Sequence, residues 1–299
     1  MPIRGPVQVL IAMILVLLGA FLGGRAGHPV AGAALSLIAG MALVYTALNT
    51  LLFAIAFFGR SPVPPDRRLG FGGAIALYLR EWWALVTLYT YYHIPALTRR
   101  PAGKWRGGSS GTAVVFVHGF CCNSGFWLPL QREVAIHVPH ALYAITLDPL
   151  WASIDTSTRQ LEALLDSVAE EGNERIILVG HSMGGLVSRS CYQHYAHRDR
   201  IVQIITIGSP HHGTRHAHVS PWRNAKQMRP GNAWLAGLNA STWQHPRLTS
   251  IYSLHDTVIA PQLSSRLDGA ENMELTGIGH MEMSRHTEIQ AALLQALKG

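Results

Sequence analysis

The chain has 299 residues, of which 48% are hydrophobic and only 14% charged, whereas a soluble globular domain carries about a quarter charged residues. This composition excludes intrinsic disorder, and only three cysteines at this length exclude a small disulfide scaffold. The formal net charge is +7. Its basic excess lies in residues 1–110, between apolar runs, which is typical of a membrane-inserted segment and not of a nucleic-acid partner. The chain therefore divides near residue 110 into a membrane part and a water-soluble part.

Two uncharged apolar runs lie near the N-terminus, at residues 7–24 and 29–59. About 20 apolar residues are enough to cross a bilayer as a helix, so we expect two transmembrane helices within residues 1–59. The first run could instead be a cleavable signal peptide with Arg4 in its basic region. Against this, a second apolar run follows at once, and no clear A-x-A cleavage site separates the two.

A third segment, residues 72–95, is rich in Leu, Trp and Tyr but carries Arg80 and Glu81 near its middle. Charges at the bilayer centre are costly, whereas a helix with aromatic residues and a charged face suits the membrane interface. We expect an interfacial helix here rather than a third span. Residues 60–111 are accordingly assigned to this juxtamembrane helix and a linker.

The number of spans decides the topology. With two spans, Arg60, Arg67 and Arg68 lie on the same side of the membrane as Arg4. The positive-inside rule makes that side cytoplasmic. The side that holds the soluble part stays open, with the cytoplasm favoured.

Residues 112–299 alternate between short β-branched runs and segments of helical period. Strands alternating with helices predict an α/β fold with a mostly parallel sheet covered on both faces. Near-continuous apolar runs fit strands that are buried on both faces. One amphipathic helix is expected after the N-cap candidates Thr156 and Ser157, and another at the C-terminus. The expected strands are 113–117, 141–147, 175–179, 202–207 and 250–254.

The pattern G-x-S-x-G occurs twice, at residues 107–111 and 180–184. The first copy has no strand before it and is interpreted as part of the linker. The second follows an expected strand and opens an expected helix, which is the strand–turn–helix context of a nucleophile elbow. We therefore expect Ser182 to be a nucleophile rather than a helix-capping serine in a glycine-rich turn.

A serine hydroxyl needs a base, and the base needs an orienting carboxylate. Asp256 follows the last expected strand, at the carboxyl end where ligand-facing residues collect, and His280 lies on a loop before the final helix. We assign Asp256 as the orienting acid and His280 as the general base. The rival base is His286, and the rival acids are Asp268 and Glu274.

Acyl transfer also needs donors for the developing oxyanion. The backbone N–H of Met183, directly after the nucleophile, is one candidate, and that of Phe120, on the loop after the first expected strand, is the second. Cys121 and Cys122 follow Phe120 at once. We interpret these cysteines as a packed pair of small residues rather than as a redox or zinc site.

Five motifs follow one another along the chain: VHGF (117–120), GHSMGG (180–185), SPHHGT (209–214), SLHD (253–256) and GHM (279–281). In this order they resemble the α/β-hydrolase lipases and esterases, in particular the bacterial triacylglycerol-lipase-like group related to the GPI-inositol deacylase family. The resemblance covers residues 112–297 and implies a serine carboxylic-ester hydrolase with Ser182, Asp256 and His280 at the matching positions. It does not extend to residues 1–110.

Two further features lie between the expected acid and nucleophile. Four histidines at residues 211–218 lack an acidic or cysteine neighbour at ligand spacing, so we predict no metal site there. Residues 215–245 form a long segment with several large apolar side chains, and long loops over active sites are often lids. We expect an apolar lid or acyl-binding wall, with an ordinary packed helix as the alternative.

The sequence therefore predicts two transmembrane helices followed, at residues 112–299, by an α/β-hydrolase catalytic domain. The expected function is a membrane-anchored serine esterase or lipase of a bacterial inner membrane, acting on acyl esters or lipids without a cofactor. An acyltransferase or thioesterase on the same fold is the main alternative. A non-catalytic membrane scaffold is the third, and it would predict a missing catalytic residue, whereas none is missing.

Overall fold

The computed structural model describes residues 21, 25, 27–94, 102–240 and 246–298. The chain forms two compact units, Met1–Leu51 and Leu52–Gly299. Helix α2 (Pro29–Gly59) coincides with the second apolar run, and its residues Val30–Gly59 are long and apolar enough to cross a membrane. It is the only such helix in the described residues. The first predicted span, residues 7–24, lies almost wholly outside them.

The second unit is built on a seven-stranded sheet of order β1-β3-β2-β4-β5-β6-β7. Strand β1 pairs antiparallel with β3, and all other pairs are parallel. The five predicted strands are confirmed, with small shifts at their ends, whereas the edge strands β1 and β7 were not predicted. The strands are β1 (Ala102–Arg106), β2 (Thr112–Val117), β3 (Ala141–Ile145), β4 (Arg175–His181), β5 (Ile201–Ile207), β6 (Arg247–Ser253) and β7 (Glu271–Leu275).

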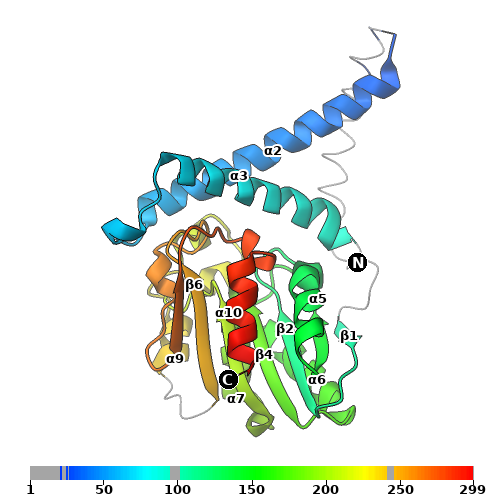
Figure 1. The fold of residues 1–299 in the computed structure, drawn as a ribbon, viewed down its shortest axis with the longest axis vertical. Helices are drawn as coiled ribbons and strands as arrows, with labels where there is room; N and C mark the ends of the chain where they lie inside the picture. Colours follow the sequence, from blue (N-terminus) through cyan, green and yellow to red (C-terminus); the bar gives the residue numbers. More distant parts are fainter. Residues whose placement is uncertain (1–20, 22–24, 26, 95–101, 241–245, 299) are drawn as a thin grey trace. The chain divides into compact units, whose positions relative to one another are not determined.

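Helices connect the strands and cover both faces of this sheet (Figure 1). The longer ones are α3 (Phe71–Thr87), α5 (Leu128–His137), α6 (Ile154–Glu170), α7 (Met183–His194), α8 (Arg223–Gln227), α9 (Ala233–Ala240) and α10 (Thr287–Lys298). Short helical turns are η1 (Pro65–Arg67), η2 (Leu88–Tyr92, a π-helical turn), η3 (Ser124–Trp127), η4 (Arg198–Arg200), η5 (Arg215–His218), η6 (Gln262–Ser265) and η7 (Glu282–Ser284).

The central strands bury both of their faces, as their continuous apolar runs predicted. In β2, Val115 and Val117 belong to the core that α6 and α7 share, whereas Val114 and Phe116 belong to the core under α5 and α10. Successive side chains of a strand point to opposite faces, so one apolar run supplies two separate cores. This arrangement confirms the predicted parallel sheet with helices on both faces.

The start of α6 differs from the sequence prediction. The N-cap is Ser153, whose hydroxyl accepts a hydrogen bond from the backbone N–H of Thr156 at 3.2 Å. Thr156 and Ser157, the predicted caps, lie inside the first turn. The amphipathic face itself is confirmed, because Leu161, Leu165 and neighbouring apolar residues of α6 are buried.

Helix α3 belongs to the same compact unit as the sheet. It crosses above one end of the sheet in Figure 1 and buries Leu77, Glu81, Ala84 and Leu85. The unit thus begins at Leu52, well before residue 112. The π-helical turn η2 continues α3, and its Leu88 joins the core under α5 and α10.

Candidate active site

Ser182 lies in the turn between β4 and α7, with φ of 54°. A non-glycine residue rarely adopts positive φ, and such strain collects at active sites. Glycines make the turn possible: a Cβ at Gly184 would lie 2.0 Å from the carbonyl oxygen of Val117, and one at Gly180 would lie 2.5 Å from the backbone nitrogen of Gly185. The close approach of strand and helix therefore holds Ser182 in a tight, strained turn, as the motif predicted.

The predicted acid and base form a buried pair. Nδ1 of His280 lies 2.8 Å from Oδ2 of Asp256, and both side chains are about 1% exposed. The other oxygen of Asp256 accepts the backbone N–H groups of Val258 at 2.8 Å and Ile259 at 2.7 Å. Because Nδ1 donates to Asp256, Nε2 of His280 is the ring nitrogen that keeps its lone pair.

The pair lies next to the nucleophile turn. The N–H of Ser182 bonds the carbonyl of Ile207, and a Cβ at the following Gly208 would lie 3.1 Å from Oδ2 of Asp256 and 3.3 Å from Nδ1 of His280. The Ser182 hydroxyl itself makes no hydrogen bond to another described residue. Catalytic hydrogen bonds are often long in ligand-free structures and tighten when substrate binds.

None of the rival residues joins this pair. Glu274 binds Arg67 and the hydroxyl of Tyr252, and Asp268 is exposed. His286 caps the start of α10, where its Nδ1 accepts the N–H of Glu288 at 3.3 Å.

His181, which the sequence did not single out, packs directly against the predicted base. Its ring stacks on Phe126 with centroids 4.1 Å apart, and it lies 4.4 Å from the ring of His280. Its Nε2 lies 3.3 Å from the carbonyl oxygen of His280. Burial, with the nearby His280 and His118, lowers the pKa of His181 well below its usual value, so the ring is neutral. The only signal in the sequence was its position beside Ser182.

The loop after β2 passes close to Ser182. A Cβ at Gly119 would lie 2.8 Å from Cβ of Ser182. His118 holds this loop, because its Nδ1 donates to the carbonyl of Gly119 at 2.7 Å and its Nε2 accepts the N–H of Leu147 at 2.9 Å. The next residue, Phe120, lines a small cavity together with Ser182.

Of the two predicted oxyanion donors, Met183 follows Ser182 directly, and Phe120 lines the same small cavity as Ser182. Met183 is the first residue of α7, where backbone N–H groups lack partners within the helix. Cys121, after Phe120, also has positive φ, at 57°. It is partly exposed and Cys122 is buried, and neither forms a disulfide.

The cavity beside Ser182 has a volume of about 60 Å³ and mostly apolar walls. The segment after residue 214 supplies much of them, including Ala217, Ala225 and Met228. The ring of Trp222 lies 5.4 Å from that of Phe120. Helix α9, by contrast, buries Leu235 and Leu238 in the core that α6 and α7 share. The first half of the predicted lid segment is thus a pocket wall, and α9 is a packed helix.

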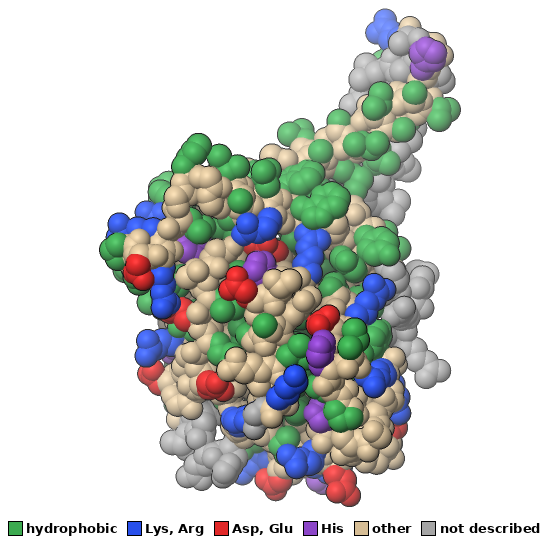
Figure 2. Space-filling view, in the orientation of Figure 1, with side chains coloured by type: hydrophobic (Ala, Val, Ile, Leu, Met, Phe, Trp, Pro, Cys, Tyr) green, Lys and Arg blue, Asp and Glu red, His purple; other side chains and the backbone are tan. Residues whose placement is uncertain are grey.

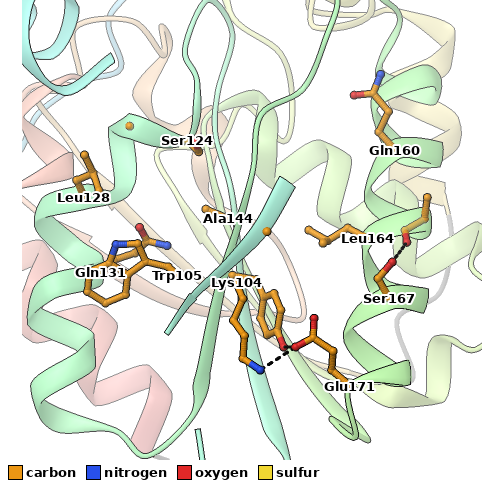
Figure 3. A pocket seen from close by; sticks show the side chains of 14 residues that line it. Lys104, Trp105, Ser124, Leu128, Gln131, Ala144, Gln160, Leu164, Ser167 and Glu171 are labelled. Carbon is orange, nitrogen blue, oxygen red and sulfur yellow. Dashed lines mark hydrogen bonds and ion pairs between the residues drawn. The ribbon is translucent and has the colours of Figure 1, made fainter. Parts of the chain in front are cut away.

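A second, larger cavity lies elsewhere. It has a volume of about 950 Å³, is bordered by β1, α5 and α6, and includes none of the predicted site residues (Figure 3). Lys104 and Glu171 form an ion pair of 2.7 Å at its edge, and Glu171 also accepts the hydroxyl of Tyr143.

The histidines of residues 211–218 make separate contacts. His211 is buried between Arg189, 3.1 Å away, and Thr206, 3.1 Å away. His216 lies 3.0 Å from the carbonyl oxygen of Leu52. In the described part of the chain, no three His, Cys, Asp or Glu side chains gather closely enough to hold a metal ion.

The sheet order, the serine turn and the buried Asp256–His280 pair define the α/β-hydrolase fold. Solved structures share it: a mature lipase of Bacillus licheniformis superposes with a TM-score of 0.56 at 17% identity, covering 66% of this chain and 96% of that one. A phospholipase of Legionella pneumophila superposes with a TM-score of 0.53 at 14% identity, covering 65% and 60%. At these identities the similarity shows the fold.

Residues 133–266 match the family model of a PGAP1-like alpha/beta domain. The chain is 34% identical over 110 residues to a GPI inositol-deacylase of Candida albicans, covering 37% of this chain and 24% of that protein. It is 28% identical over 105 residues to a pimeloyl-[acyl-carrier protein] methyl ester esterase of Vibrio atlanticus, covering 35% and 39%. The matched segments thus span well under half of these relatives. The resemblance noted from the sequence motifs is confirmed.

Proposed function

We propose that this protein is a membrane-anchored serine hydrolase of carboxylic esters. The observation that carries the proposal is the strained turn of Ser182 beside the buried pair of Asp256 and His280. Related proteins named as a deacylase and an esterase support the same chemistry.

The proposed mechanism follows from these positions. Ser182 Oγ attacks the ester carbonyl while Nε2 of His280 takes its proton, and Asp256 stabilises the imidazolium that forms. The N–H groups of Met183 and Phe120 stabilise the oxyanion; one such donor contributes about 10²–10³ in rate. His280 then returns the proton to the leaving alcohol, and an activated water hydrolyses the acyl-enzyme.

The walls of the small cavity favour an apolar acyl group. Phe120, Ala217, Met228 and Ile259 face the space next to Ser182, and apolar walls with few polar groups are typical of sites for acyl chains. We therefore propose that the acyl part of the ester binds there.

Helix α3 supports membrane association, because it carries an exposed apolar stripe at intervals of four residues. Phe71, Ile75, Leu79 and Trp83 are 85%, 45%, 57% and 55% exposed, and hydrophobic side chains gather along α3 in Figure 2. Such a stripe is typical of a helix that lies on a lipid surface. Together with the apolar helix α2, it supports the predicted membrane anchor and interfacial helix.

The chemistry is tested with the full chain in detergent and a series of esters of graded acyl length. We expect ester hydrolysis, an acyl adduct on Ser182 in mass spectra of trapped enzyme, and loss of both in His280→Ala. An adduct on another residue, or full activity of His280→Ala, would contradict the proposal.

The membrane contact is tested separately in vesicles. Leu79→Glu places a charge in the apolar stripe, so we expect slower hydrolysis of esters embedded in vesicles and an unchanged rate on a water-soluble ester. Ile136→Glu is the matched control, because Ile136 is 76% exposed on α5, away from this stripe. Equal rates of hydrolysis of vesicle-embedded esters by Leu79→Glu and Ile136→Glu would contradict the proposed contact of α3 with lipid.

A further inference from the structure

Helix α3 carries a buried carboxylate against the catalytic loops. Glu81 is 0% exposed, although its sequence position predicted a charged face at the membrane interface. Its Oε1 accepts the Thr257 hydroxyl at 2.6 Å and the N–H of Met281 at 2.8 Å, and its Oε2 accepts the N–H of Glu282 at 3.1 Å. Each carboxylate oxygen is therefore satisfied by groups of the hydrolase domain.

The three donors flank the predicted acid and base. Thr257 follows Asp256 directly, and Met281 and Glu282 follow His280. Thr257 also joins the two loops, because its hydroxyl oxygen accepts the N–H of His280 at 3.3 Å while it donates to Glu81. A chain of hydrogen bonds thus runs from the backbone of His280 through Thr257 to Glu81.

The pattern of donors requires an acceptor at position 81. Two backbone N–H groups and one hydroxyl point at the carboxylate, which when ionised is acceptor-only. Burial raises the pKa of Glu81, and the hydrogen bonds from Met281 and Thr257, with the nearby His280, oppose that shift. Burying a carboxylate is costly unless its partners compensate, and here the three donors from the loops of Asp256 and His280 supply that compensation.

Further contacts hold the loop of His280 against α3. Arg80 pairs with Glu282 at 2.9 Å and also donates to the carbonyl of Gly277. Glu282 in turn accepts the N–H of Gly279 at 2.7 Å. A Cβ at Gly279 would lie 2.5 Å from Oε2 of Glu81, so the loop approaches Glu81 as closely as a glycine permits.

We propose that Glu81 is a positioning residue for His280, through which α3 sets the geometry of the catalytic base. This inference rests on the proposed function of His280. Glu81 holds the loops of Asp256 and His280 at a fixed separation, which the 2.8 Å bond between the two side chains needs. When ionised, Glu81 also places a second negative charge near the imidazolium that forms during acylation.

The sign of the expected pH effect follows from the charges around Glu81. His280 faces it from the base loop, Glu282 and Arg285 from the turn that follows, and Arg80 from α3 itself. At a pH where Glu81 is ionised, its replacement by Gln removes a negative charge that acts on His280. The protonated imidazole then loses stabilisation, so the acid limb of the pH–rate profile moves to lower pH.

The experiment compares Glu81→Ala and Glu81→Gln in the full chain. We expect kcat to fall about 10²-fold in Glu81→Ala, because small misplacements of a catalytic group have effects of that order. Glu81→Gln, which keeps an acceptor for Thr257 and Met281, should fall less and show the shifted acid limb. KM should stay within about threefold in both variants, because the pocket walls are untouched.

Glu274→Gln is the matched control. Glu274 also ties a residue before the sheet, Arg67, to the hydrolase domain, but through β7 and away from His280. It should lower stability no more than Glu81→Gln does and leave kcat and the pH profile unchanged. An equal loss of kcat in Glu274→Gln would show that both carboxylates act only through folding and would overturn the inference.

Thr257→Val keeps the test decisive if Glu81→Ala fails to fold. It removes the hydroxyl between Glu81 and His280, so its effect on kcat should not add to that of Glu81→Gln in the double variant. Additive effects would overturn the inference, as would wild-type kcat and pH profile in Glu81→Gln. Loss of the proposed function is distinguished by His280→Ala: if that variant remains active, His280 is not the base, whatever the Glu81 variants do.

Discussion

The two copies of G-x-S-x-G share one sequence pattern but adopt different structures. Residues 107–110 are exposed in the connection between β1 and β2, where Ser110 bonds the ring of His140 at 2.8 Å. The copy at residues 180–184 joins β4 to α7, and its Ser182 is only 6% exposed and has positive φ.

The difference lies in the flanking elements and not in the motif. A strand buried on both faces delivers the chain to residue 180, and a helix must start at once at Met183. The turn between them has room only for glycines at 180 and 184. The linker copy has no such constraint at Gly107, where an added Cβ meets only the end of the Lys104 side chain, at 3.6 Å.

Replacing each of the two serines by alanine should give the largest difference in activity between the two copies. We expect Ser182→Ala to lower kcat/KM by at least about 10³-fold, because the residual rate then comes from binding and the oxyanion donors. Ser109→Ala should leave activity and labelling by a fluorophosphonate probe unchanged. The measurement is hydrolysis of a soluble ester together with probe labelling. Labelling that persists in Ser182→Ala would contradict the assignment of Ser182 as the nucleophile.

Replacing the first glycine of each copy by alanine should change the free energy of unfolding by different amounts. In Gly180→Ala, the new Cβ would lie 2.5–2.6 Å from backbone atoms of Gly184 and Gly185, so we expect destabilisation of about 3 kcal/mol. Gly107→Ala should stay within about 0.5 kcal/mol of the wild type. Urea unfolding curves of both variants check this, and equal midpoints would show that the elbow is not tightly packed.

The histidines beside the two copies should differ in their effect on the pH dependence of stability. Burial lowers the pKa of His181 well below 6.5, so the unfolded chain binds more protons than the folded one below about pH 6.5, and stability is lost on acidification. His181→Gln should flatten the fall of Tm between pH 7 and 5 by about 2 °C or more.

His140→Gln is the counterpart next to the linker copy. Burial and the charge of Arg175 also lower the pKa of His140, but its ring is only half-buried, so the change in slope should be smaller. If His140→Gln flattened the fall of Tm with pH as much as His181→Gln does, the difference in burial between the two rings would be contradicted.

The edge strands show where local patterns carry too little signal. Strand β1 reads AGKWR and β7 reads ENMEL, without the apolar runs that predicted the five strands between them. Helix α3 shows the same limit for function. Arg80 and Glu81 predicted a charged face at the membrane interface, whereas Glu81 contacts Met281, 200 residues away in the chain.

Local patterns were enough to predict the central strands and the turn of Ser182, because each depends on neighbours within a few residues or on a motif. Only the tertiary structure placed the rings of His181 and His280 in contact and brought Glu81 to the loop of His280. Such contacts join residues that are far apart in the chain, and folding the helices over the end of the sheet is what brings them together.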